Sequence, residues 1–166
     1  MAVAAILLMS QAQAMSPVPF FQHVRHIGLL CALDRAESPA PDATAVDPSP
    51  IAVLSEEALC RRAVAALSGL VTSGPAVVPF APNDDRIADP AALLVLLHAT
   101  LRAEDGRRLL AVAATLHRAG ADAGAPPFFM MPPQALTVTG SLDDAALDAA
   151  LRRLFGPLAQ ALHANP

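Results

Sequence analysis

Residues 91–118 read AALLVLLHATLRAEDGRRLLAVAATLHR, and the fold of this protein depends on how that stretch is arranged. Two apolar runs flank a central Glu104-Asp105-Gly106. An Asp-Gly pair between apolar runs is a strong signal for a β-hairpin. The high content of alanine and leucine favours the alternative, which is a hairpin of two helices.

The distribution of polar side chains decides between the two arrangements. If Arg102 lies opposite Arg107 in a β-hairpin, one face of the strand pair is wholly apolar. The other face then contains the polar residues of the strand interiors, which are His98, Thr100, Thr115 and His117. A half-buried antiparallel pair requires this segregation, whereas a helical arrangement would spread the same side chains around its axis. We therefore predict a β-hairpin.

A helix is predicted upstream of the hairpin, over residues 56–71. Ser55 is a good N-cap, and Glu56 and Glu57 follow it in the first turn, where negative charge is favourable. One apolar stripe with helical spacing contains Cys60, Val64, Leu67 and Val71. This stripe places Cys60 on the buried face of the helix.

Two further strands and a second helix complete the pattern. Residues 76–80, AVVPF, and residues 135–139, ALTVT, are short runs typical of strands. Ser141, with Asp144 three residues later, predicts the start of a C-terminal helix, which Gly156-Pro157 should kink or interrupt. The order helix, four strands, helix, with a possible extra strand before it, predicts an α+β fold. We expect a two-layer sandwich, in which an antiparallel sheet of about four strands has two helices on one face.

The N-terminal part of the chain is organised differently. Residues 1–14, MAVAAILLMSQAQA, are apolar and end in Ala-x-Ala, which predicts a signal segment, although no Lys or Arg precedes the apolar run. Residues 36–50 are rich in Pro and Ala and predict an extended linker, after which residues 51–163 form a single α+β domain. Residues 15–35 are ambiguous between a detached tail and a first strand tied to the domain through Cys31.

The two cysteines, Cys31 and Cys60, fit an exported protein that contains one disulfide. Two buried free thiols are the alternative. Lipidation of Cys31 is disfavoured, because Leu30 stands where that processing requires a small residue. We expect a periplasmic or secreted protein, and a cytoplasmic location is the alternative.

Composition excludes several classes of protein. The chain has 166 residues, of which 54% are hydrophobic and 16% are charged, so it is not a wholly disordered chain, a coiled coil or a collagen-like fibre. Its net charge is −4 and it contains no basic run, which argues against a nucleic-acid partner. The apolar run at the N-terminus is too short for a transmembrane span.

The sequence contains no recognisable catalytic or cofactor motif. His98 and His117 share one face of the predicted hairpin but lie far apart along it, so an enzyme that uses either is a minor hypothesis. His23 and His26, three residues apart, have no evident third metal ligand nearby. One acidic loop offers four oxygen ligands, which are Asn83, Asp84, Asp85 and Asp89. It lacks the glycine and the closing bidentate acid of a calcium site. We therefore expect no catalytic residue, no metal and no cofactor.

Phe128, Phe129, Met130 and Met131 form an apolar run between two Pro-Pro pairs. If this run is a strand, two of its side chains face the core and two face outward. The outward pair is the best candidate for contact with a partner, because the prolines keep the run from joining a regular ladder.

Together these observations predict a small exported non-catalytic domain that binds a protein or a cell-envelope component. The alternative is a small-molecule-binding protein with an apolar pocket between the sheet and the helices.

Overall fold

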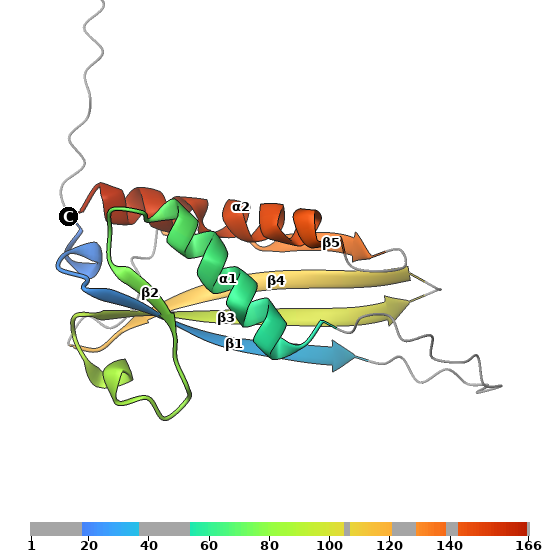
Figure 1. Cartoon of the computed structure of the whole chain (residues 1–166), viewed down its shortest axis with the longest axis horizontal. Helices are drawn as coiled ribbons and strands as arrows, with labels where there is room; N and C mark the ends of the chain where they lie inside the picture. The colour runs from blue at the N-terminus through green and yellow to red at the C-terminus, as the bar shows by residue number, and fades with distance from the viewer. Residues whose placement is uncertain (1–17, 37–53, 105–106, 121–128, 139–142, 166) are drawn as a thin grey trace, which may run out of the picture.

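The computed structural model describes residues 18–36, 54–104, 107–120, 129–138 and 143–165. The signal segment predicted at residues 1–14 lies outside these ranges, as does the predicted linker from residue 37 onward. The described residues form a five-stranded sheet with two helices packed against one of its faces (Figure 1).

The elements follow one another along the chain in the order η1 (Pro19–Phe21), β1 (His26–Ala36), α1 (Glu56–Leu70), β2 (Ala76–Pro79), η2 (Asp85–Ala88), β3 (Ala92–Glu104), β4 (Arg107–Arg118), β5 (Gln134–Val138) and α2 (Asp144–His163). The strands lie side by side in the order β2-β1-β3-β4-β5.

The sheet is mixed, whereas the sequence predicted about four antiparallel strands. β1 pairs in parallel with both of its neighbours, so that His26 lies opposite Ala76 of β2 and opposite Ala92 of β3. The other two pairings, β3 with β4 and β4 with β5, are antiparallel. The sequence left residues 15–35 open between a tail and a first strand, and β1 now separates the two strands that would otherwise have been neighbours. The coarser prediction of an α+β fold with two helices is confirmed.

Alternate side chains of the central strands form the core. Leu93, Val95 and Leu97 of β3 point toward the helices and are almost completely buried. The helices contribute the apolar side chains that pack on them, among them Leu59, Leu67, Leu147, Leu151 and Phe155. Because α1 contacts β1 and β2 while α2 contacts β5, the two helices together cover the width of the sheet on this side.

The helix starts show how local chemistry sets the boundaries. Ser55 is the N-cap of α1, and its hydroxyl accepts a hydrogen bond from the Ala58 N–H, as the sequence predicted. The N-cap of α2 is Asp143, whose carboxylate accepts from the Ala145 N–H. The predicted cap Ser141 lies outside the described residues. The helix is continuous through Pro157, so the predicted interruption at that residue does not occur.

The sequence predicted correctly which side chains of the β3–β4 hairpin share a face, but it predicted the wrong cross-strand partners. Arg102 lies opposite Leu109 and Glu104 lies opposite Arg107, a shift of two residues from the predicted register. A two-residue shift leaves every side chain on its face, because side chains alternate with a period of two. The observed register leaves only Asp105 and Gly106 between the paired residues Glu104 and Arg107.

Cys31 of β1 and Cys60 of α1 form a disulfide, with an S–S distance of 2.09 Å and a sequence separation of 29. The predicted pairing is confirmed. Closing a loop of this length stabilises the fold by roughly 3–4 kcal/mol in the chain-entropy account. The bond fastens the first helix to a central strand.

The connection from β2 to β3 crosses the face of the sheet opposite the helices. Phe80 lies directly over Gly28 of β1 and packs with Ala92 and Leu94 of β3. A Cβ atom at residue 28 would overlap the Phe80 ring, so this position requires glycine. The crossover thus covers one end of the second sheet face.

Replacing Gly28 tests this contact. We expect Gly28→Ala to expel the Phe80 ring and to lower the free energy of unfolding by about 1–3 kcal/mol, as overpacking does. Gly69→Ala is the matched control, because a Cβ there meets nothing within 4 Å and alanine favours a helix. Urea denaturation of both variants measures the effect, and an unchanged midpoint for Gly28→Ala would contradict the packing described.

Candidate binding surface on the uncovered sheet face

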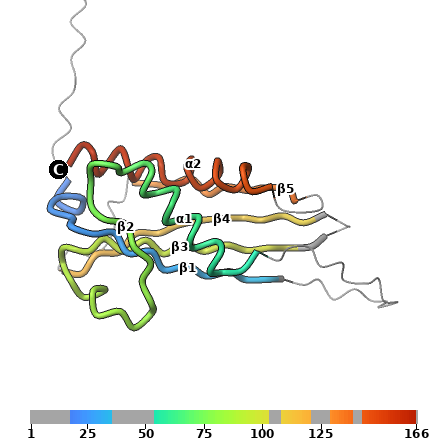
Figure 2. The backbone as a smooth tube through the Cα atoms, in the orientation of Figure 1, coloured from blue at the N-terminus to red at the C-terminus, as the bar shows by residue number. Residues whose placement is uncertain are grey.

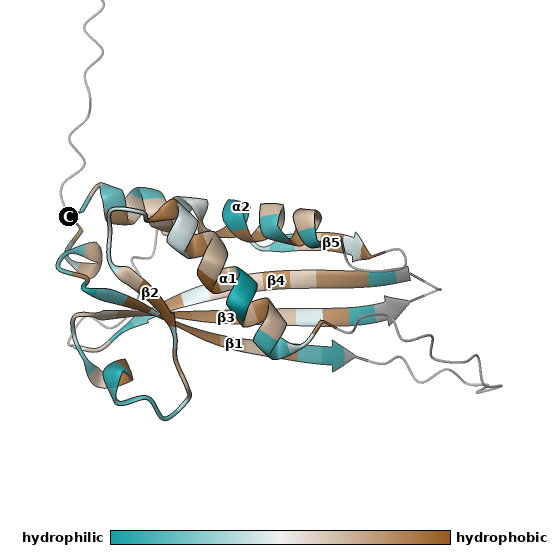
Figure 3. Cartoon of the chain, in the orientation of Figure 1, coloured by the Kyte–Doolittle hydropathy of each residue, from teal (hydrophilic) through white to brown (hydrophobic). Residues whose placement is uncertain are grey.

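Beyond the crossover, the second face of the sheet is covered by nothing among the described residues. Its large apolar side chains are Leu96 of β3, 39% exposed, and Leu109 of β4, 46% exposed. In Figure 3 the middle of β1, β3 and β4 is largely apolar, and hydrophilic colour increases toward the hairpin end. The exposed small side chains of the same face are Ala32, Ala111, Ala113 and Ala135. We call this region the open sheet face.

The polar residues of the open sheet face do not form a cleft. His98 Nε2 lies 2.7 Å from Asp34 Oδ2, so an imidazole and a carboxylate are in hydrogen-bond contact. Their side chains are 53% and 71% exposed, which leaves the pair in open solvent. His98 lies opposite Ala113, whereas His117 lies opposite Leu94, so the two histidines of the hairpin do not meet. The structure therefore brings His98 to a partner that the sequence did not predict, because β1 was not placed in the sheet.

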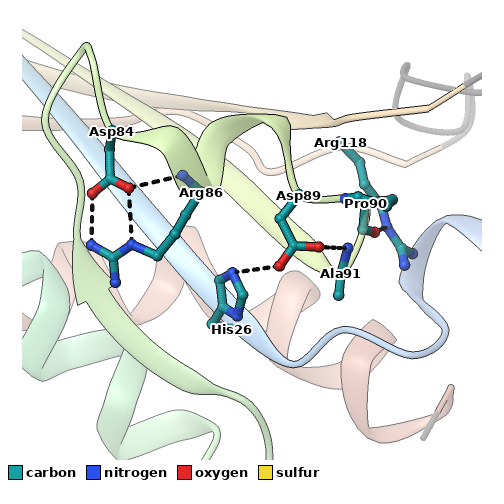
Figure 4. Close-up of polar contacts among 7 residues, drawn as sticks. All are labelled: His26, Asp84, Arg86, Asp89, Pro90, Ala91 and Arg118. Carbon is teal, nitrogen blue, oxygen red and sulfur yellow. Dashed lines mark hydrogen bonds and ion pairs between the residues drawn. The ribbon is translucent and has the colours of Figure 1, made fainter.

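A polar cluster fastens the crossover at the edge of this face (Figure 4). Asp84 accepts hydrogen bonds from the Arg86 side chain, from Nε at 2.9 Å and from Nη2 at 2.6 Å, and from the Arg86 backbone N–H at 3.0 Å. These hydrogen bonds lower the pKa of the Asp84 carboxyl from 3.8 to about 2. The Arg86 guanidinium also lies 4.4 Å from the centre of the Phe80 ring. The cluster holds the loop that keeps Phe80 on Gly28.

The same cluster joins the crossover to the N-terminal segment. Asp89 Oδ1 accepts from the Ala91 N–H, and Asp89 Oδ2 lies 3.4 Å from His26 Nε2 (Figure 4). That imidazole nitrogen is buried and has no hydrogen-bond partner among the described residues. Arg118 donates to the carbonyls of Pro90 and Phe20. The acidic loop is therefore used for capping and anchoring.

No group of three or more metal-ligating side chains occurs within the described ranges. Of the two histidines at the predicted H-x-x-H spacing, His26 faces Asp89, and His23 lies apart from it, at the cleft between the helix ends. In the part of the chain that the structure describes, no helix is both long and apolar enough to cross a membrane.

The apolar run before β5 is only partly exposed. Phe129 packs against Phe21 with 4.9 Å between ring centres, and Met131 is buried. Met130 is 75% exposed. Phe128 lies outside the described residues. One described side chain of the predicted binding run, Met130, is therefore available to a partner.

The cavities at the surface of the described residues include two of several hundred cubic ångströms. One, of about 420 Å³, lies between α1 and α2 and is lined by Arg61, Arg62 and Arg152. Asp144 and Asp148 both pair with Arg62, and Glu57 pairs with Arg61, so most of this positive charge is neutralised. The other, of about 740 Å³, lies at the end of the sheet where both helices terminate. Neither lies between the sheet and the helices, where a pocket was the alternative prediction.

Comparison with known proteins gives little further information. No family model matches the chain, and no curated protein is significantly similar to it. A solved structure of a single-residue variant of the PelC dodecamer from Paraburkholderia phytofirmans is similar at 12% identity and a TM-score of 0.46, covering 82% of this chain and 90% of that one. A second crystal form of the PelC dodecamer gives 12% identity and a TM-score of 0.40, covering 87% and 94% of the two chains. We draw no conclusion about ligand, partner or assembly from so distant a likeness.

The Asp84–Arg86 contact predicts a pH effect at the crossover. A carboxyl with a lowered pKa stabilises the fold above its unfolded value of 3.8, and this contribution is lost as the pH falls toward 2. In Arg86→Gln the Asp84 pKa should return toward 3.8, because the charged partner is gone. Arg61→Gln, which removes a partner of Glu57 on α1, should leave the Asp84 pKa unchanged. Carboxyl ¹³C NMR titration reads the value directly, and an Asp84 pKa near 3.8 in the unmodified protein would refute the contact.

Proposed function

We propose that this protein is a non-catalytic binding module, periplasmic or secreted, whose open sheet face contacts a protein partner in the cell envelope. The observation that supports the proposal is the exposure of Leu96 and Leu109 on a sheet face that no other described element covers. Apolar side chains on an uncovered sheet face are a common feature of interaction sites, since leaving them in water is unfavourable.

The shape of the face favours a broad protein surface over a small molecule. Leu96 lies opposite Thr115, and Leu109 lies opposite Thr137, so the two leucines stand well apart along the sheet. Alanines occupy much of the space between them and leave the strand backbones within reach of a partner. The face combines apolar and polar groups, because His98 stands between Ala32 and Ala113 and contacts Asp34, and protein interfaces commonly have such a mixed composition.

Two further features support export and partner binding. The Cys31–Cys60 disulfide is a bond that persists in oxidising compartments and is rare in the cytosol. Met130, exposed beside the prolines that precede β5, offers a flexible apolar side chain of the kind that adaptable binding surfaces use. No described geometry favours catalysis, because the one imidazole–carboxylate hydrogen bond stands in open solvent.

Site-specific photocrosslinking in the source cells tests the proposal. A benzophenone amino acid at Ala113, on the open sheet face, should give a discrete protein adduct, whereas the same group at Ala65, exposed on α1, should not. Leu96→Glu combined with Leu109→Glu should abolish the adduct, because charge on both apolar positions disfavours docking.

Leu70→Glu is the matched control, since Leu70 is 38% exposed but belongs to α1. It should leave the Ala113 adduct intact. Equal adducts from Ala113 and Ala65, or an adduct that survives both glutamates, would show that the open sheet face is not the contact surface.

A further inference from the structure

The cavity of about 740 Å³ at the end of the sheet is separate from the open sheet face. In Figure 2 the segment before β1, the segment after α1 and the end of α2 meet at one end of the molecule. These are the segments that line the cavity, and both helices terminate there. Small-molecule sites span roughly 300–1,000 Å³, so the volume suits one ligand of modest size. We call it the helix-end cleft.

The floor of the helix-end cleft is apolar. Phe21 and Leu162 are buried core residues, and Val24 and Val71 are partly buried beside them. Leu70, 38% exposed, extends the apolar surface toward solvent. An apolar floor with an exposed leucine favours a ligand with a hydrocarbon body.

The rim of the cleft is basic and contains hydrogen-bond donors. His23, Arg25 and His163 line it, and none of the described lining residues is an aspartate or a glutamate. No carboxylate of the described chain pairs with Arg25. An arginine without a carboxylate beside an apolar floor suits an anionic head group.

The ends of the two helices do not reverse this preference for an anion. Helix C-termini have partial negative charge, which would favour a cation. At the end of α2, however, the carbonyls of Gln160 and Leu162 accept from the Ala164 and Asn165 N–H groups, and the Ala161 carbonyl accepts from the Asn165 side chain. At α1 the Leu67 carbonyl accepts from the Val71 N–H. These carbonyls therefore already have hydrogen-bond donors, whereas the Arg25 guanidinium has no carboxylate partner among the described residues.

His23 gives an independent sign that the site is constrained. Among the described residues it is the one non-glycine residue with a positive φ, at 56°. L-residues rarely adopt this conformation, and where it persists the surroundings impose it, often at ligand sites. Here it lies at the rim of the cleft, two residues before Arg25.

We propose that the helix-end cleft binds an amphipathic monocarboxylate, of which a free medium-chain fatty acid is the simplest. The carboxylate lies at Arg25, with His23 and His163 as further N–H donors, and the hydrocarbon chain lies along the apolar floor. This binding does not depend on the open sheet face or on its partner.

Titration of the full chain with decanoate, followed by ¹H–¹⁵N NMR, tests the proposal. Decanoate should shift the resonances of residues 21–25, 70–75 and 159–165. 1-Decanol, which lacks the charge, and butyrate, which lacks the long chain, should bind at least about tenfold more weakly, since a charge-assisted hydrogen bond and buried methylenes are each lost.

Variants identify the groups responsible. Arg25→Gln should weaken decanoate binding about tenfold or more. Arg152→Gln, which changes an exposed arginine of α2 outside the cleft, should leave it unchanged, as should Leu96→Glu on the open sheet face. Absence of decanoate shifts in the cleft, equal binding of 1-decanol, or unchanged affinity in Arg25→Gln would each overturn the proposal. Tighter binding of decylammonium than of decanoate would also overturn it, by showing that the helix ends dominate the rim.

Discussion

The two helices pack on one side of the sheet because every second side chain of β3 and β4 points to that side. Leu93, Val95 and Leu97 meet the helices, while Leu96 and His98 face the other way. This alternation divides the molecule into a covered face and an uncovered one. The core, the open sheet face and the position of the β2–β3 crossover all depend on it, since the crossover can settle only on the face that the helices leave free.

Local patterns in the sequence predicted most of the elements. The Ser55 cap, the apolar stripe of α1 and the pairing of β3 with β4 each depend on residues that are close in sequence, and each was predicted within one or two residues. The hairpin faces were also predicted correctly, because a register error of two residues does not move a side chain to the other face. The disulfide followed from there being only two cysteines, of which Cys60 falls on a buried stripe.

Long-range arrangement was harder to predict. The sequence of β1 contains Gly28 and charged residues, so it does not by itself distinguish a strand from a tail. This strand nevertheless makes the sheet mixed, because it pairs in parallel with both of its neighbours. Without its position, the contact of His98 with Asp34 has no sequence signal, and the partner of Gly28 is not identified. The helix-end cleft was missed for the same reason, since its lining comes from three separate parts of the chain. A glycine amid apolar strand residues was the one available hint of a close approach by another segment.

The division into a covered and an uncovered face is the central claim, and solvent paramagnetic relaxation of leucine methyl groups tests it most directly. With a soluble gadolinium chelate, the methyls of Leu96 and Leu109 should relax strongly, whereas those of their neighbours Leu97 and Leu110 should be protected. The contrast between adjacent residues is specific to alternating strands with one face buried. Similar relaxation of all four leucines would contradict the account.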